Sequence, residues 1–311
     1  MAEVAKGEEI SPDNPELTFP VPWGAIAAKT WGDPCLRPVL LVHGIQDNAG
    51  SFDRLVPLLP KIFYYVAIDL PGHGKSTRFP KGIALDLLMY VSAVNRVIRQ
   101  LKWDQFYYIG HSLGGQIGVY YSAMYPHQVA KLIVLDAIMP RFLSGDDFMK
   151  HYVNMTQRII NLESKMLDAS PPSYTYEGAL DRMIERRPSP ITREAAEALI
   201  KRSLKKGQNG YYYSTDQRLK FMLVVPVSME QHLYNMSFVQ CPFLLVATKI
   251  LIKYINMDYY NGVNRKTLEI FKKNKRFKLV EVDGYHDVHN NEPEVVAPHV
   301  SEFLIHQKSA L

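Results

Sequence analysis

The sequence has little cysteine and no long apolar stretch. Cys35 and Cys241 are the only cysteines among 311 residues. They are too few for a disulfide framework and lack the spacing of a zinc site, so they favour a reducing compartment. Apolar runs such as Pro38–Val42 and Phe243–Ala247 fall far short of the ~20 residues that a transmembrane helix needs. Disulfide-rich secreted domains and membrane-spanning proteins are therefore excluded.

The two ends of the sequence give little indication of a targeting signal. Residues 1–15 lack the apolar segment of a secretory signal peptide and are expected to form an N-terminal tail. Ser309, Ala310 and Leu311 resemble the S-K-L ending of peroxisomal proteins but lack its basic middle residue. We expect a cytoplasmic protein, with only weak support for a peroxisomal one.

Charge of one sign is not concentrated. The 36 Lys and Arg exceed the 31 Asp and Glu by a small margin, and the one basic cluster, residues 272–278, falls between a helical pattern and a strand pattern. A solvated connection explains this cluster, so we expect no nucleic-acid partner. Histidine, Asp, Glu and Cys residues do not occur with metal-ligand spacing. No metal and no cofactor are expected.

Short apolar runs alternate with helical patterns, which predicts an α/β fold with a mostly parallel sheet and flanking helices. The sheet is expected to come from residues 16–138 and 240–308. The predicted strands are 16–20, 24–31, 38–43, 62–69, 105–110, 131–136, 242–247 and 277–282, and the predicted helices of these two parts are 84–101, 114–123, 266–273 and 294–306.

A different pattern interrupts this alternation at residues 139–239. Helical segments rich in Met and Tyr are predicted at 146–167, 175–187 and 191–205, separated by Ser-Pro-Pro at 170–172 and Pro-Ser-Pro at 188–190. We expect an inserted helical cap that sets substrate choice. Seven of its side chains and the tyrosines at 211–213 either line an apolar pocket or pack the cap onto the core: Met149, Tyr152, Met155, Met166, Met183, Met222 and Met229.

One motif carries a nucleophile. Ser112 lies in Gly110-His111-Ser112-Leu113-Gly114, directly after a predicted strand and before a predicted helix. This is the arrangement of a nucleophile elbow, a strained turn in which bulky neighbours two residues away on either side would clash. Gly110 and Gly114 meet that need, so we predict Ser112 as the nucleophile.

Two backbone N–H groups are predicted to form an oxyanion hole. Leu113 follows the nucleophile at a helix N-terminus, where the helix dipole favours an oxyanion. Ile45 follows the end of an earlier strand, at Val42-His43-Gly44-Ile45, from which hydrolases of this design supply the other donor.

The general base is expected after the last strand. His286 and His289 both lie there, at the carboxyl edge where catalytic groups collect in open α/β sheets. We favour His286, which comes first after the glycine-containing turn, and expect His289 to be a structural hydrogen-bond partner. Asp69 and His73, in the loop after strand 62–69, are also given structural roles.

From roughly Glu16 to His306 the chain resembles the α/β-hydrolases and, within them, the serine hydrolase-like proteins. The resemblance depends on the segments 42–44, 69–76, 110–115 and 284–286, which occur in the family's order. It implies Ser112 as nucleophile and His286 as base, with an acid between them in the sequence.

The position of the acidic residue departs from the family's pattern. The family places an Asp shortly after the strand that here is 242–247, but residues 248–254 contain no carboxylate. Asp258 is the next candidate. Asp136, after strand 131–135, resembles the acid of haloalkane dehalogenases, and we favour it, although a structural hydrogen-bonding role is an open alternative.

These residues predict a carboxylesterase-like serine hydrolase that acts on a small-molecule ester or thioester through a Ser-His-acid triad and an acyl-enzyme. A serine in the elbow argues against dehalogenases and epoxide hydrolases, which use Asp; hydroxynitrile lyase and carbon–carbon hydrolase activities stay open. The missing carboxylate after residue 247 suggests an alternative, a binding protein that keeps the fold with weakened catalysis.

Overall fold

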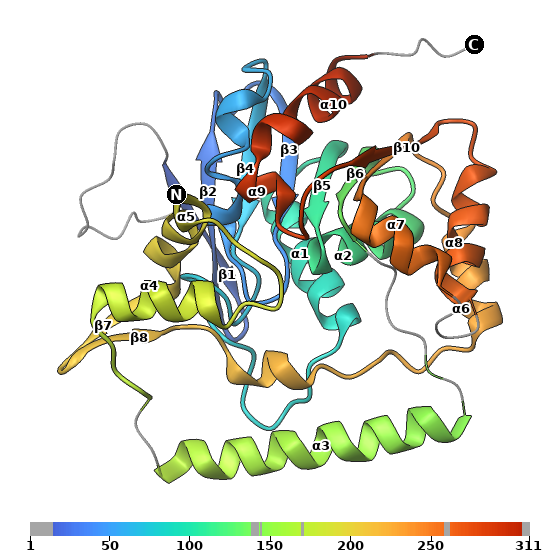
Figure 1. The fold of residues 1–311 in the computed structure, drawn as a ribbon. Coiled ribbons are helices and arrows are strands. Elements are labelled where there is room, and N and C mark those ends of the chain that lie inside the picture. Colours follow the sequence, from blue (N-terminus) through green and yellow to red (C-terminus); the bar gives the residue numbers. More distant parts are fainter. Residues whose placement is uncertain (1–14, 138–142, 144, 169–170, 258–261, 307–311) are drawn as a thin grey trace.

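An eight-stranded sheet forms the centre of the molecule (Figure 1). The computed structural model describes residues 15–137, 143, 145–168, 171–257 and 262–306. The strand order is β1-β2-β4-β3-β5-β6-β9-β10, in which β1 and β2 are antiparallel to their neighbours and all other pairs are parallel. The strands are β1 (Glu16–Val21), β2 (Gly24–Trp31), β3 (Arg37–Val42), β4 (Phe63–Ile68), β5 (Phe106–His111), β6 (Val129–Leu135), β9 (Phe243–Thr248) and β10 (Phe277–Val282).

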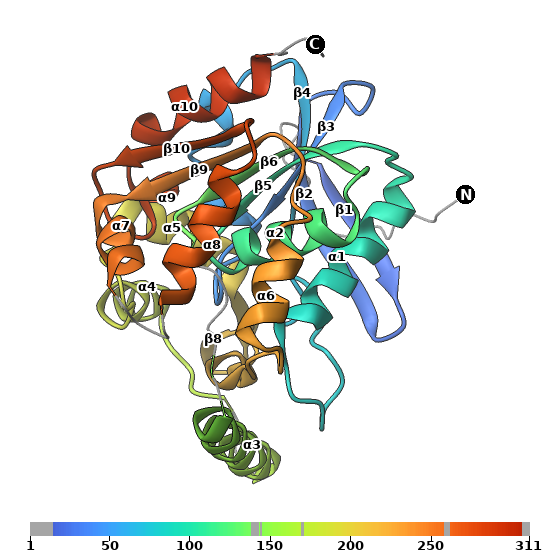
Figure 2. The ribbon, with the colours of Figure 1, turned by 90° about the vertical axis from the view of Figure 1, so that its right-hand side faces the viewer.

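Helices cover both faces of this sheet (Figure 2). One face packs against α1 (Leu87–Leu101), α2 (Leu113–Met124), α6 (Met229–Met236), α7 (Lys249–Asn256) and α8 (Val263–Lys272). The opposite face packs against η1 (Ala49–Phe52), η2 (Val56–Leu58), α9 (Val288–Asn291) and α10 (Pro293–Ile305). The predicted α/β fold with a mostly parallel sheet is confirmed.

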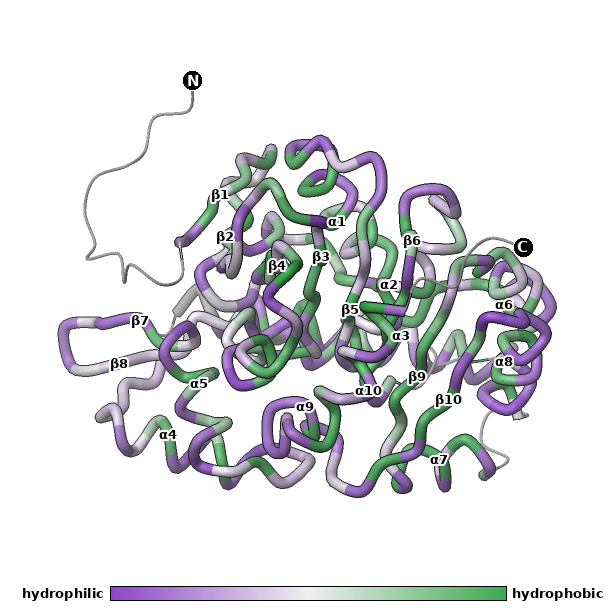
Figure 3. The backbone as a smooth tube through the Cα atoms, turned by 90° about the horizontal axis from the view of Figure 1, so that it is seen from above, coloured by the Kyte–Doolittle hydropathy of each residue, from purple (hydrophilic) through white to green (hydrophobic). Residues whose placement is uncertain are grey.

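The central strands are apolar on both faces because helices cover both. Along β3, Leu40 and Val42 pack into one hydrophobic cluster, while Val39 and Leu41 pack into the other. Successive strand side chains point to opposite faces, so a strand buried on both sides is a continuous apolar run. Figure 3 shows this as hydrophobic colour along the central strands, against the mainly hydrophilic hairpin of β7 (Leu204–Gly207) and β8 (Gly210–Tyr213).

Between β6 and β9 the chain leaves the sheet and forms a helical insert, which we define as α3 to η3. Its elements are α3 (Gly145–Asp168), α4 (Tyr176–Glu185), α5 (Arg193–Ser203), the hairpin β7–β8 and η3 (Gln217–Phe221). Helices α4 and α5 share a small core of their own, including Leu180, Ala195 and Leu199. Figure 1 shows α3 as a long helix at the outer side of the insert. The boundaries 139–239 of a separate cap stay a prediction, and α6 packs beside the sheet on α2 and α8.

The prediction differs from the structure at several elements, among them α5, α6 and α7. The predicted helix 191–205 ends at Ser203, because Leu204 begins the β7–β8 hairpin in which Lys205 pairs with Tyr212. Helices α6 and α7 were not predicted. Thr248 stops β9 and begins α7, since its hydroxyl accepts a hydrogen bond from the Leu251 N–H at 3.1 Å. No helix among the described residues is long and apolar enough to span a bilayer.

Candidate active site

Ser112 lies in a sharp turn between β5 and α2. Its backbone has φ 50° and ψ −115°, a conformation that costs energy for any residue with a side chain. A Cβ at Gly110 would lie 2.4 Å from the Gly114 carbonyl oxygen, and one at Gly114 would lie 2.0 Å from the Val42 carbonyl oxygen. Glycine is therefore required at both positions, as the sequence analysis argued for a nucleophile elbow.

The His286 ring joins Ser112 to Asp136. Its Nε2 lies 2.9 Å from Ser112 Oγ, and its Nδ1 lies 2.8 Å from Asp136 Oδ2. A carboxylate only accepts hydrogen bonds, so Nδ1 carries the proton and Nε2 is left as the acceptor for the serine hydroxyl. This is the tautomer that a general base needs.

Asp136 reaches this position because β6 and β9 are neighbours in the sheet. Leu135 pairs with Val246, and the Asp136 N–H donates to the Val246 carbonyl at 2.8 Å. The Thr248 N–H donates to Asp136 Oδ1 at 2.7 Å, which fixes the carboxylate and aims Oδ2 at His286. Asp136 has φ 44°, so strain occurs here as well as at Ser112. Asp258, the other predicted acid, lies outside the described residues.

The electrostatic surroundings raise the pKa of His286. Burial works to lower this pKa, but the hydrogen bond and the negative charge of Asp136 outweigh burial and stabilise the imidazolium. The His286 side chain is 41% exposed, whereas that of Asp136 is 4% exposed. The imidazole can therefore meet a ligand while its acid partner stays shielded from water.

The predicted oxyanion donors come from two segments, the start of α2 and the loop after β3. Leu113 is the first residue of α2, so its N–H has no acceptor within the helix. Ile45 follows β3 in a turn closed by a hydrogen bond from the Asp47 N–H to the Gly44 carbonyl. Ile45 and Ser112 line the same cleft. The assignment of these two N–H groups as oxyanion donors stays a prediction.

His289 differs sharply from His286. Its ring is fully buried and lies 4.0 Å from the His111 ring, centroid to centroid. Neither ring nitrogen of His289 has a hydrogen-bond partner among the described residues, so the structural hydrogen-bonding role that we expected is wrong. Burial and the neighbouring His111 hold the pKa of His289 well below its usual range. His111 in turn places its Nε2 2.9 Å from the His286 carbonyl oxygen and holds that loop.

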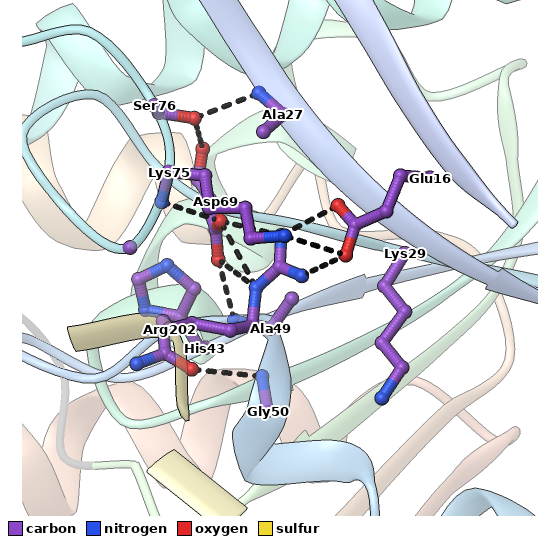
Figure 4. Close-up of polar contacts among 12 residues, drawn as sticks. Glu16, Ala27, Lys29, His43, Ala49, Gly50, Asp69, Lys75, Ser76 and Arg202 are labelled. Carbon is purple, nitrogen blue, oxygen red and sulfur yellow. Dashed lines mark hydrogen bonds and ion pairs between the residues drawn. The ribbon is translucent and has the colours of Figure 1, made fainter. Parts of the chain in front are cut away.

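Asp69 lies in a second polar cluster, which Figure 4 shows. Asp69 accepts hydrogen bonds from the Ala49 and Lys75 N–H groups and pairs with Arg202 of the insert at 2.7 Å. Arg202 also pairs with Glu16 of β1. These contacts join the loops after β3 and β4 to α5, in line with the structural role predicted for Asp69. His73 is buried, and its Nδ1 lies 3.1 Å from the Pro71 carbonyl oxygen of the same loop.

A third cluster was not anticipated from the sequence. Arg187, at the end of the α4 segment, pairs with Asp47 at 2.7 Å and with Asp287. Burial works to raise the pKa of Asp47, but Arg187 and His111 outweigh it and hold that pKa far below its usual range. Asp47, His111 and Asp287 lie close enough together to share a cation, but the Arg187 guanidinium already pairs with both carboxylates. Ser189 adds a contact, because its Oγ accepts from the His286 N–H at 3.2 Å.

A cleft of about 960 Å³ opens between the sheet edge and the insert. Ser112 and His286 line it from the core. Apolar side chains of the insert line it from the other side, among them Leu162, Met183, Tyr212 and Tyr213. Such a mixed cleft, with a few polar groups at one place, is typical of small-molecule sites.

Some of the predicted cap side chains take one of the two roles left open, and others take neither. Met183 lines the cleft, as do two of the three tyrosines at 211–213. Met149 and Tyr152 are exposed on α3, and Met222 packs against the large hydrophobic cluster. The side chain of Met166 lies outside the described part of the structure.

Comparison with known proteins agrees with this fold. The alpha/beta hydrolase fold family matches residues 37–161. Serine hydrolase-like protein 2 of Homo sapiens is 36% identical over 303 residues, covering 93% of each chain, and the probable serine hydrolase of Drosophila melanogaster is 32% identical over 93% of this chain and 87% of its own. The crystal structure of a hypothetical protein from Pseudomonas aeruginosa PAO1 superimposes with a TM-score of 0.79, at 27% identity, over 93% of this chain and 97% of that one. The chain therefore belongs to the α/β-hydrolases and, among them, to the serine hydrolase-like proteins.

Proposed function

We propose that this protein is a serine hydrolase that cleaves carboxylic ester or thioester bonds through an acyl-enzyme. The observation that carries the proposal is the continuous hydrogen-bonded chain from Ser112 Oγ through both nitrogens of His286 to Asp136 Oδ2. The serine hydrolase names of the relatives and the cleft at Ser112 support it further.

In the first half of the reaction, His286 Nε2 takes the Ser112 hydroxyl proton as the oxygen attacks the acyl carbon. The negative charge that develops on the carbonyl oxygen meets the N–H groups of Leu113 and Ile45. Collapse of this intermediate breaks the bond to the alcohol or thiol, which leaves with the proton from His286. The acyl group stays on Ser112.

In the second half, water replaces the leaving group. His286 removes a proton from the water, which attacks the acyl carbon, and Ser112 regains its proton when the acid is released. Asp136 does not exchange protons in this scheme. Its charge stabilises the imidazolium, and its hydrogen bond keeps the ring in the required tautomer.

The test removes the nucleophile. We expect Ser112→Ala to abolish both hydrolysis of p-nitrophenyl esters and covalent labelling by a fluorophosphonate probe. The control is Ser237→Ala, at the exposed end of α6, which should keep full activity and labelling. Thermal melting of both variants verifies that they are folded. Full activity of Ser112→Ala would refute the assignment.

The second reading, a binding protein with weakened catalysis, gives a different outcome in the same experiment. It requires that the natural protein fail to label and fail to hydrolyse a broad ester panel, while a ligand still raises its melting temperature. The sequence feature that suggested this reading was the missing carboxylate after β9. In the structure Thr248 occupies that strand end and donates its N–H to Asp136, so an acid is present near His286 from the neighbouring strand.

A further inference from the structure

The cleft that contains Ser112 is lined by an excess of positive charge. Three acids line it, Asp47, Asp216 and Asp287. Arg187 pairs with both Asp47 and Asp287 and so leaves one negative charge, whereas Asp216 is matched one to one by Arg218 at 2.7 Å. Only one negative charge is therefore left to balance the remaining cations of the lining.

Five further cations line the cleft: Arg78, Lys165, Arg182, Arg186 and Lys220. None of them forms an ion pair with another described residue. They come from separate elements, namely the loop after β4, α3, α4 and its end, and η3. Cations gathered around one concave surface focus their field into it and favour an anionic ligand.

Two of these cations are held in place without losing their charge. The Arg78 guanidinium donates to the Ser214 carbonyl at 2.7 Å. The Arg182 guanidinium lies over the ring of Tyr174, 5.5 Å from its centroid, and Tyr174 also lines the cleft. Arg186 follows one turn after Arg182, with its N–H bonded to the Arg182 carbonyl, so both lie on one side of α4. Cations fixed in this way bind an anion at a smaller entropic cost.

We propose, on the basis of the hydrolase function proposed above, that the substrate is an acyl ester or thioester whose alcohol or thiol part carries phosphate groups. The apolar side chains of the cleft, such as Leu162 and Met183, suit the acyl chain, which has no charge. The five cations suit several negative charges on the other part. Arg in particular binds phosphate through paired N–H donors. Hydrolysis consumes one water and releases the fatty acid and the phosphate-bearing alcohol or thiol.

The experiment compares substrates that differ only in phosphate. One pair is S-octanoyl-phosphopantetheine and S-octanoyl-pantetheine; the other is 1-oleoyl-glycerol-3-phosphate and 1-oleoyl-glycerol. In at least one pair we expect kcat/KM to be about tenfold higher for the phosphate-bearing member at low ionic strength, and the advantage to shrink at about 0.5 M NaCl. The pair that shows the advantage distinguishes a thiol carrier from a glycerol phosphate. Equal rates within both pairs, or preference for a succinyl ester with a neutral alcohol, would overturn the proposal.

Variants test whether these particular cations are responsible. We expect Arg182→Gln/Arg186→Gln to lower kcat/KM about tenfold for the phosphate-bearing substrate and to leave its neutral counterpart within about twofold. The matched control is Lys201→Gln/Lys205→Gln, which removes the same charge from exposed positions of the insert. Equal losses in the two double variants would assign the effect to net charge and contradict a built site.

Binding to Ser112→Ala separates this inference from the hydrolase proposal. Isothermal titration of this variant with octanoyl-coenzyme A and with 1-oleoyl-glycerol-3-phosphate needs no catalysis. Salt-sensitive binding of either, weakened by Arg182→Gln/Arg186→Gln, supports the phosphate site even if the natural protein proves inactive. If neither compound binds to Ser112→Ala while the natural protein hydrolyses p-nitrophenyl octanoate, the hydrolase function stands and the phosphate site is refuted.

Discussion

Two aspartates directly follow strands of the same sheet, but their surroundings differ. Asp136, after β6, bonds to His286, whose side chain is 41% exposed. Asp69, after β4, pairs with Arg202, whose side chain is 6% exposed. A histidine can gain and lose a proton near neutral pH, whereas an arginine stays charged. The first pair can therefore take part in proton transfer, while the second can only hold segments together.

The buried Asp69–Arg202 pair also connects more of the chain. Asp69 fixes the N–H groups of Ala49 and Lys75, and Arg202 brings α5 and Glu16 of β1 to the same point (Figure 4). Around Asp136, by contrast, the Thr248 N–H and His286 are its side-chain partners. We therefore predict that substitution of Asp136 changes activity. Substitution of Arg202, the partner of Asp69, should change stability instead.

The largest effect is expected from Asp136→Asn. An amide at this position can donate to Nδ1 and stabilise the wrong tautomer of His286, so kcat should fall about 10³-fold to 10⁴-fold. The fold should persist because Asn still offers an oxygen to the Thr248 N–H. Ester hydrolysis gives the rate, and thermal melting verifies folding. A folded variant with more than about a tenth of the natural kcat would show that another group supplies the acid.

Arg202→Met should act on stability instead. Removing the guanidinium leaves the fully buried Asp69 without its counter-charge, which typically costs about 3–5 kcal/mol. Urea unfolding measures this loss. The control Glu16→Gln changes a partner that is 36% exposed and should cost no more than about 1 kcal/mol. A loss of kcat by Arg202→Met under conditions where it is folded would contradict the separation of the two regions.

Arg187→Met is expected to have a smaller effect, and it tests a residue that shares features with both the Asp136 and the Asp69 surroundings. Arg187 belongs to the insert, as Arg202 does, but its partner Asp287 is the neighbour of His286 in the chain. At a temperature where the variant is folded we expect kcat/KM to fall about tenfold, because the loop that carries His286 loses a fixed contact. Arg187→Lys keeps the charge without the paired donors and should recover only part of the rate. Unchanged kcat/KM in a folded Arg187→Met would assign Arg187 to stability alone.

The difference between these residues also explains what the sequence could predict. Ser112 is recognisable because its requirements are local: a strand, two close glycines and a helix. The order of strands and helices follows equally from local apolar patterns, so most of the sheet was predicted. The acid depends on β6 and β9 lying side by side, which no local pattern contains, and resemblance alone favoured Asp136.

Arg187 and Arg202 could not be found in this way. On a helical pattern an arginine is typical of a solvated surface, and their partners lie 140 and 133 residues away in the chain. The hairpin β7–β8 did have a local signal, the pair Asn209-Gly210 directly before a run of three Tyr residues, but the helical pattern before it hid where α5 ends.

The smallest expected effect is a separation of two pH dependences. The rate needs neutral His286, whose pKa Asp136 raises against the effect of burial. The acid limb of kcat/KM should therefore have its midpoint above about 6.5, the ordinary histidine value. Replacing Asp136 by Asn removes the charge and should move this limb to lower pH.

Stability should respond at lower pH and through buried histidines other than His286. Burial, together with the nearby His43, lowers the pKa of His73 to about 3, and burial also keeps His289 neutral in the folded state. Unfolded histidines bind protons below about pH 6.5, so the unfolded state then gains protons that the folded state does not, and stability falls as pH decreases from about 6.5. His286 works in the opposite direction, since its raised pKa stabilises the folded state in acid, but the deeply buried histidines outnumber it. Rates and melting temperatures measured across this range should therefore diverge, with activity lost first. If both fall together, acid unfolding rather than the titration of His286 limits the rate.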